Sequence, residues 1–261
     1  MANHLTPRAV LLFDIDGVIR DVGGSYRRAI VETVHHYSGM RPHVASIDAL
    51  KAEGCWNNDW EASLELLRRG GLGHLPSFEA LVEVFNSFYF GGDPEGDPSA
   101  WQGFIGSEPL LVEREFFQQL SAAGVAWGFV SGAEPPSARF VLEQRLGLSH
   151  PPLIAMGDAP DKPDPTGFLR LATELCGPLG TSTTPVAYLG DTVADVLTVQ
   201  RARQEQPQQR FLSLAVAPPH LHSPDDRERR GLYEAQLLQA GADAVIPTTL
   251  AVLAALEPVL G

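Results

Sequence analysis

Near its N-terminus the chain reads Val10-Leu11-Leu12-Phe13-Asp14-Ile15-Asp16-Gly17-Val18. Four apolar residues in a row are typical of a buried strand, and here two carboxylates one residue apart follow them. Residues i and i+2 of an extended segment lie on one face, so Asp14 and Asp16 are expected to point into one cleft. Gly17 lets the backbone turn sharply away. Two like charges this close are costly at the end of a buried strand unless a cation lies between them. The alternative interpretations are a solvated strand end and an aspartate that caps a βα turn.

The composition indicates an ordinary soluble globular protein. The chain has 261 residues, of which 44% are hydrophobic and 20% are charged. This length allows a sizeable core and a smaller second unit. The net charge of −13 argues against a nucleic-acid partner, because there is no basic field to neutralise phosphates. A small phosphorylated substrate is compatible with this charge, since a metal and a few local cations can hold it.

Cysteine and lysine usage give two further expectations. Cys55 and Cys176 lie far apart in the sequence, which fits a reduced cytoplasmic chain better than a disulfide scaffold. No signal-like N-terminus and no apolar run of membrane-spanning length is apparent, so we expect a soluble, cytoplasmic protein without a membrane partner. Of the 19 cationic residues only Lys51 and Lys162 are lysines, which points to places where a compact ammonium is needed; coding bias toward arginine is the alternative explanation.

Residues 20–105 are predicted to form an all-helical insert. They show helical spacing of apolar residues and no strand pattern, with helices expected over 26–37, over 46–67 with an interruption, and from Phe78 onward. Glycine-rich segments lie near both ends of the insert and could act as hinges.

The remaining residues, 1–19 and 106–261, are predicted to form an α/β core. Strand and helix patterns alternate after the insert, and such repeated βα units imply a parallel, doubly wound, Rossmann-like sheet. The strands are expected at 125–130, 153–156, 186–191, 211–216 and 242–246, and the helices at 107–120, 136–146, 166–175, 193–203, 231–238 and 249–256.

Polar residues follow four of the expected strands. Asp14 and Asp16 follow the first, Ser131 follows the second, Lys162 lies in the loop after the third, and Asp191 follows the fourth. In a doubly wound sheet, ligands bind at the carboxyl ends of the strands. Each residue alone is an ordinary choice for a βα turn, but their occurrence in this order predicts a functional site.

These groups suit phosphoryl transfer to and from a carboxylate. Asp14 would be the nucleophile that forms an aspartyl phosphate, and Asp16 would protonate the leaving oxygen and later activate water. Oxygen-only ligands favour Mg²⁺, for which we expect Asp14, Asp16 (through its carbonyl), Asp191 and Asp195 as ligands. Lys162 would neutralise the nucleophile and the phosphate. Ser131 and nearby backbone N–H groups, such as that of Gly132, would bind the phosphate oxygens.

The order of these motifs resembles that of the haloacid dehalogenase-like (HAD) hydrolase superfamily, in the branch with a helical cap after the first motif (subfamily IA, with a C1 cap). Motif one resembles residues 13–18, motif two Val130-Ser131-Gly132, motif three Lys162-Pro163 and motif four residues 190–195. The resemblance spans nearly the whole chain. It implies that residues 20–105 are the cap domain and that residues 1–19 and 106–261 are the catalytic core.

The resemblance also narrows the reaction. Phosphatase branches have the second acid of motif one, as Asp16 is here, whereas the dehalogenase and phosphonatase branches lack it. The mutase branch that shares this cap uses a histidine early in the first cap helix, and residues 26–29 contain none. We therefore expect a Mg²⁺-dependent phosphatase of a small phosphorylated metabolite. The alternatives are a sugar-phosphate phosphomutase and a non-catalytic binding member of the fold. The oligomeric state, monomer or dimer, stays open.

Substrate selection is expected from the cap. Lys51, Asn57, Asn58 and Asp59 could meet the leaving group; alternatively, this region serves mainly to pack Trp56 and Trp60 against the cap interior.

Overall fold

The protein is described here from a computed structural model, which describes residues 6–53, 56, 58–181 and 183–260. The chain divides into two compact units. One unit joins the N-terminal residues 1–21 to residues 110–261, and the other is the segment 22–109 between them. The sequence places these boundaries at 20 and 105, a few residues earlier at each end.

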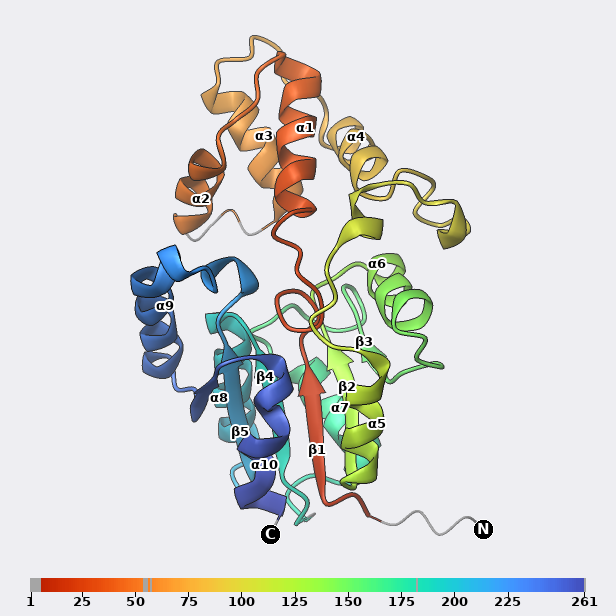
Figure 1. Cartoon of the computed structure of the whole chain (residues 1–261), viewed down its shortest axis with the longest axis vertical. Coiled ribbons are helices and arrows are strands. Elements are labelled where there is room, and N and C mark those ends of the chain that lie inside the picture. Colours follow the sequence, from red (N-terminus) through yellow and green to blue (C-terminus); the bar gives the residue numbers. More distant parts are fainter. Residues whose placement is uncertain (1–5, 54–55, 57, 182, 261) are drawn as a thin grey trace. The chain divides into compact units, whose positions relative to one another are not determined.

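The first unit is built on a six-stranded sheet in which every strand pairing is parallel (Figure 1). The strand order is β3-β2-β1-β4-β5-β6. The strands are β1 (Ala9–Phe13), β2 (Val125–Val130), β3 (Leu153–Ile154), β4 (Val186–Gly190), β5 (Phe211–Val216) and β6 (Ala244–Ile246). Because β1 lies in the middle, between β2 and β4, Asp14 leaves the sheet where the strand order reverses.

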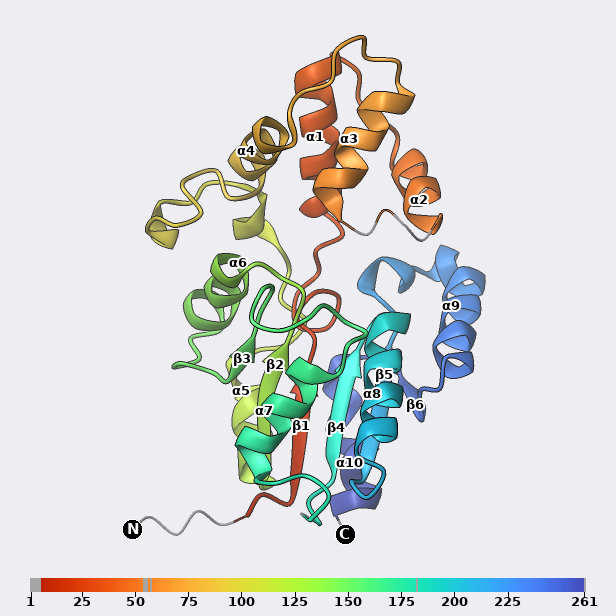
Figure 2. The same cartoon turned by 180° about the vertical axis from the view of Figure 1, so that it is seen from behind.

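Helices cover both faces of this sheet, which confirms the predicted doubly wound, Rossmann-like architecture. α5 (Arg114–Ala122) and α10 (Val252–Leu260) pack on one face, together with α6 (Pro135–Arg139) and its π-helical continuation η3 (Phe140–Arg145). α7 (Thr166–Cys176) and α8 (Val193–Glu205) pack on the other (Figure 2). Alternate residues of β1 serve the two cores: Leu11 and Phe13 face α5, whereas Val10 and Leu12 face α7. Burial on both sides explains the unbroken apolar run of the sequence.

The C-terminal part completes the β6 edge of the same sheet. Helix α9 (Arg227–Gln239) packs against α8 and β6, with Leu237 fully buried. Two contacts from this part reach the site edge. Tyr233 donates a hydrogen bond from its hydroxyl to the carbonyl of Asp191 (2.9 Å), and Thr249 donates one to the carbonyl of Val18 (2.7 Å).

The second unit is helical. It contains α1 (Tyr26–Ser38), α2 (Val44–Ala52), α3 (Asp59–Arg69) and α4 (Phe78–Tyr89), followed by the short 3-10 turns η1 (Pro98–Ala100) and η2 (Phe104–Ser107). Helix α1 packs against α3 and α4. The core of this unit is apolar and aromatic: the ring of Trp60 lies edge-on to Phe78 and Phe85 at 6.3 and 6.4 Å between centroids.

One predicted helix begins in the wrong place. The helix expected from Ser107 begins at Arg114, and residues 108–113 are not helical. Pro109 disfavours helical backbone at the residue before it. The next residues are then used in pairing: Leu110 forms an antiparallel bridge with Arg20, and the N–H of Leu111 donates to the carbonyl of Ile19 (2.8 Å).

No helix among the described residues is both long enough and apolar enough to cross a lipid bilayer.

Candidate active site

The nucleophile candidate Asp14 is held at the carboxyl end of the central strand. Its backbone N–H donates to the carbonyl of Leu189 in β4 (2.9 Å), so the backbone of Asp14 is still paired with the neighbouring strand. Its Oδ1 accepts a hydrogen bond from the N–H of Ile15 (2.8 Å). Asp14 is only 6% exposed. The backbone therefore fixes one carboxylate oxygen.

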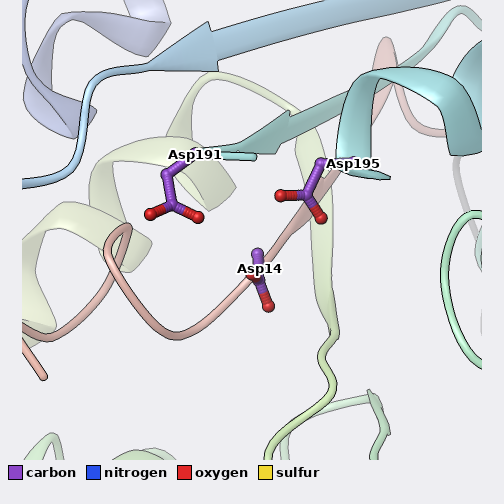
Figure 3. Close-up of side chains that lie close together, drawn as sticks. All are labelled: Asp14, Asp191 and Asp195. Carbon is purple, nitrogen blue, oxygen red and sulfur yellow. The ribbon is translucent and has the colours of Figure 1, made fainter. Parts of the chain in front are cut away.

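Three buried carboxylates meet at this edge of the sheet. Figure 3 shows Asp14 after β1, Asp191 after β4 and Asp195 in the first turn of α8. One oxygen from each lies within 4.8 Å of the others. Parallel neighbours bring these residues together, because β1 and β4 pair in register up to Phe13 and Leu189.

Two glycines are required for this close packing. Gly17 has φ of +75°, and a Cβ built there would lie 2.1 Å from Oδ2 of Asp191. A Cβ at Gly190 would lie 2.3 Å from the Cβ of Asp195. Both contacts are far shorter than real Cβ contacts, so any side chain at either position would displace a carboxylate of the cluster.

The ammonium group of Lys162 contacts this cluster. Its Nζ lies 3.1 Å from Oδ2 of Asp14 and 2.6 Å from Oδ1 of Asp195, and it donates to the Tyr188 hydroxyl at 3.2 Å. Burial alone would lower the pKa of Lys162, but Asp14 and Asp195 outweigh that effect and raise its pKa well above the usual value. Lys162 is therefore a fixed ammonium ion.

Asp195 has its charge compensated by neighbouring groups. It forms a capping box with Thr192, whose N–H and hydroxyl donate to Oδ2 at 2.9 and 2.6 Å, while Oδ1 is bound by Lys162. Burial raises the pKa of Asp195, but Lys162 and the Thr192 hydrogen bonds prevail, and the net shift is downward. Both oxygens of Asp195 are thus used within the protein.

Asp191 is in the opposite situation. It is 9% exposed, and its carboxylate accepts no hydrogen bond from any described residue. Burial, followed by repulsion from Asp195 and Asp14, raises its pKa well above the usual value. Burial likewise raises the pKa of Asp14 to about 6, although Lys162 opposes the shift. Asp14 and Asp191 are thus two buried carboxylates, and Asp191 has no donor in the described part of the chain. They form an oxygen-rich set suited to a hard divalent cation such as Mg²⁺.

Ser131 and Gly132 lie in the turn after β2, the strand that pairs with β1. The N–H of Ser131 donates to the carbonyl of Ile154 (2.9 Å), and its hydroxyl oxygen accepts from the N–H of Ala133 (3.2 Å). Among the described residues no acceptor takes the hydroxyl proton of Ser131. Gly132 is exposed. These two residues can therefore offer donors to an anion.

The carboxylate of Asp16 is not in the three-acid cluster. Its Oδ1 accepts a hydrogen bond from Nε of Arg20 (2.7 Å), and its side chain is 28% exposed. The backbone carbonyl of Asp16 accepts no hydrogen bond within the described part of the chain, which leaves it open to a cation.

Of the residues expected to select the substrate, the structure describes the side chains of Asn58 and Asp59. Asn57 lies outside the described residues, and so does the side chain of Lys51. Asn58 is the N-cap of α3, with its Oδ1 accepting from the N–H groups of Trp60 and Glu61 (2.9 and 3.1 Å), and Asp59 is the first residue of that helix. Their contact with substrate stays a prediction.

Sequence reasoning missed three residues of the site. Tyr188 reads as one more apolar strand residue, yet its buried hydroxyl donates to the carbonyl of Val130 (2.7 Å) and accepts from Lys162. The available signal was that a buried tyrosine hydroxyl needs a partner. Thr192 could have been found as an N-cap three residues before an acid. Arg20 stands out only as a charge within an apolar stretch.

Comparison with known proteins identifies the family. A model described as haloacid dehalogenase-like hydrolase matches residues 9–203 of the chain. The chain belongs to this family. This HAD-like chain is also 30% identical over 201 residues to a protein named imidazoleglycerol-phosphate dehydratase from Phytophthora nicotianae. That stretch covers 76% of the chain but only 42% of the relative, so the chain spans less than half of the relative's length.

Solved structures show the same fold at lower identity. A phosphonoacetaldehyde hydrolase-like protein from Oleispira antarctica superimposes with a TM-score of 0.68 at 18% identity, covering 100% of this chain and 96% of the other. A predicted phosphoglycolate phosphatase from Haemophilus somnus superimposes with a TM-score of 0.67 at 14% identity, covering 96% of this chain and 99% of the other. The family and the fold expected from the four motifs are thus confirmed.

Proposed function

We propose that the protein is a Mg²⁺-dependent phosphatase that hydrolyses a small phosphomonoester through an aspartyl-phosphate intermediate. The observation that carries this proposal is the charge arrangement at the end of β1. Asp14 is a buried carboxylate in contact with Lys162, and the carboxylate of the neighbouring Asp191 accepts no hydrogen bond from the residues that the structure describes. Such a site requires further positive charge, and with that charge bound it can hold an anionic substrate next to Asp14.

The residues present fit Mg²⁺ as the missing charge. Asp14, Asp191 and the carbonyl of Asp16 would hold it. Asp195, also expected as a ligand, is assigned here to holding Lys162, because both of its oxygens already accept hydrogen bonds. When bound, Mg²⁺ supplies charge neutralisation that lets an anionic phosphate approach an anionic nucleophile.

The protein groups then divide the reaction into two steps. In the first, an oxygen of Asp14 bonds to phosphorus, the bond to the leaving oxygen breaks, and Asp16 gives its proton to that oxygen. In the second, Asp16 takes a proton from water, the water oxygen bonds to phosphorus, and the bond to Asp14 breaks. Lys162 and the Ser131 hydroxyl bind the phosphate oxygens throughout. The products are an alcohol and inorganic phosphate.

Substrate selection is proposed to reside in the helical unit. The name of the Phytophthora relative suggests one compound for a substrate panel, imidazoleglycerol phosphate, beside phosphoglycolate, sugar phosphates, nucleoside monophosphates and amino-alcohol phosphates such as histidinol phosphate.

Release of inorganic phosphate from this panel, with Mg²⁺ and with a chelator, tests the proposal. We expect at least one phosphomonoester to be hydrolysed only with Mg²⁺. Asp14→Asn should lower turnover by about 10⁴-fold, because an amide cannot act as the nucleophile. The matched control is Asp225→Asn, which neutralises an exposed aspartate of the same unit and should leave turnover unchanged. Equal turnover in wild type and Asp14→Asn would overturn the assignment.

A further inference from the structure

Arg20 is a fully buried arginine beside the proposed acid–base residue. Its exposed fraction is 0%. Nε donates to Oδ1 of Asp16 (2.7 Å), and Nη2 donates to the hydroxyl of Ser137 (2.9 Å), which is itself completely buried in α6. Burying a guanidinium is costly and requires specific partners, so the fold retains this charge at the expense of an apolar alternative.

The backbone around Arg20 fixes the guanidinium relative to Asp16. The carbonyl of Arg20 accepts from the N–H of Gly17 (2.9 Å), and its own N–H donates to the carbonyl of Ile15 (3.2 Å). Arg20 also forms an antiparallel bridge with Leu110. Residues 15–20 thus form a hydrogen-bonded turn, and the side chain of Arg20 contacts Asp16 within that turn.

This contact leaves one oxygen of Asp16 for chemistry. Oδ1 is bound by Arg20, and no described residue donates to Oδ2. An aspartate side chain otherwise samples several rotamers, of which only some would direct an oxygen to the leaving group. An anchor on one oxygen selects among them without occupying the other.

We propose that Arg20 is a positioning residue that holds Asp16 through Oδ1, so that Oδ2 exchanges the proton with the leaving oxygen and with water. The proposal rests on the phosphatase function proposed above and goes beyond it, because it assigns the orientation of the acid to a residue outside the four motifs. The competing explanation is that Arg20 only holds the fold of residues 15–21.

Leaving-group dependence separates the two explanations. The p-nitrophenolate released from p-nitrophenyl phosphate is a stable anion and needs little help from an acid. Phenyl phosphate is similar in shape, but its phenolate is more basic and needs a proton to leave. We expect Arg20→Lys and Arg20→Met to lower kcat/KM, which reports only the step in which the leaving group departs, by about 10²-fold for phenyl phosphate and by much less for p-nitrophenyl phosphate. The attack of water in the second step is common to both esters, so a loss in that step lowers kcat for both alike. Asp16→Asn should show the same selectivity, and the double variant Asp16→Asn/Arg20→Met should lose no more than Asp16→Asn alone.

Three controls keep the experiment decisive. Arg139→Met removes an exposed arginine of the same unit and should leave both esters unaffected. If Arg20→Met does not unfold cooperatively, Arg20→Lys carries the test, since it keeps the charge and loses the planar fork. Equal losses of kcat/KM for the two esters would overturn the positioning role, while inactivity of Asp14→Asn would still support the phosphatase. Equal phosphate release by wild type and Asp14→Asn would overturn the proposed function itself.

Discussion

Glu65 in the helical unit and the acid cluster of the α/β unit are buried carboxylates with opposite charge balance. Glu65 is 5% exposed and accepts hydrogen bonds from two arginines, at 2.7 and 2.6 Å from Arg68 and at 2.6 Å from Arg69. Its pKa is lowered to about 2 by the hydrogen bonds from Arg68 and Arg69. In the three-carboxylate cluster, Lys162 pairs with Asp14 and Asp195, and the pKa of Asp14 is raised to about 6, chiefly by burial.

The difference separates a structural carboxylate from one that is available for chemistry. A carboxylate that serves the fold is neutralised by its own chain, as Glu65 is, and Asp195 follows the same rule with Lys162 and Thr192. Asp14 and Asp191 do not follow it. Their unbalanced charge is a cost to stability that a bound cation would remove, which is common at functional sites.

Removing one cation from each region should give the largest contrast. Lys162→Gln leaves Asp14 and Asp195 without their cation, and we expect about 3 kcal/mol loss of unfolding free energy and about 10³-fold loss of phosphatase turnover. Arg69→Gln should change neither activity nor unfolding by much, because Arg68 still binds Glu65 and Arg69 is 44% exposed. Urea unfolding measures the change in stability of each variant, and phosphate release measures its turnover.

A comparable loss of stability in the two variants would contradict the contrast. Lys162→Arg is the control for charge. It should restore most of the stability and little of the activity, because a guanidinium does not reproduce the compact ammonium between two carboxylates.

The pH dependence of stability should run in opposite directions for the two regions. The pKa of Asp14 is about 6 in the folded chain, against an ordinary aspartate value of 3.8, so between these values the folded state binds the extra proton. The unfolding free energy of the metal-free protein should therefore fall as the pH rises from 4 to 6, by up to about 3 kcal/mol from Asp14. For Glu65, with a pKa lowered to about 2, the contribution to stability is lost as the pH falls through that value.

Urea unfolding of wild type and Asp14→Asn in a chelating buffer checks the sign. The difference between the two curves should favour Asp14→Asn increasingly from pH 4 to pH 6 and then level off. A difference that does not change with pH would show that Asp14 is ionised in the folded protein over this whole range.

The smallest expected effect is at the cap of α3. Asn58→Ala removes the side-chain acceptor of the Trp60 and Glu61 N–H groups and should cost about 1 kcal/mol of unfolding free energy. Asn58→Asp keeps the acceptor and should cost less. Ratios of kcat/KM between two phosphate esters should be unchanged if capping is the whole role of Asn58; a changed ratio would support its predicted contact with substrate.

Much of the fold and site could be predicted because the determining residues are local in sequence. The apolar run before Asp14 reflects the burial of β1 on both faces of the sheet. The glycines at 17 and 190 leave space for a neighbouring carboxylate. The family motifs therefore located Asp14, Lys162 and Asp191.

The missed features depend on partners distant in sequence or on competition between two roles. The pairing of Arg20 with Ser137, and of Tyr188 with Lys162, joins segments that only the folded sheet brings together. The role of Asp195 as a metal ligand stays a prediction; what the sequence analysis missed is the capping box that Asp195 forms with Thr192. Helix α5 was placed too early because the pairing of Leu110 with Arg20 leaves no periodic signal.

The most direct test of the central claim is a calorimetric titration of Mg²⁺ into wild type and Asp191→Asn at neutral pH. The claim is that Asp191 and Asp14 carry unbalanced charge for a divalent cation. Wild type should bind one Mg²⁺ ion, and Asp191→Asn should bind it at least about 10-fold more weakly while being the more stable protein in the absence of metal. Equal Mg²⁺ affinity in the two proteins, or lower metal-free stability of Asp191→Asn, would contradict the account.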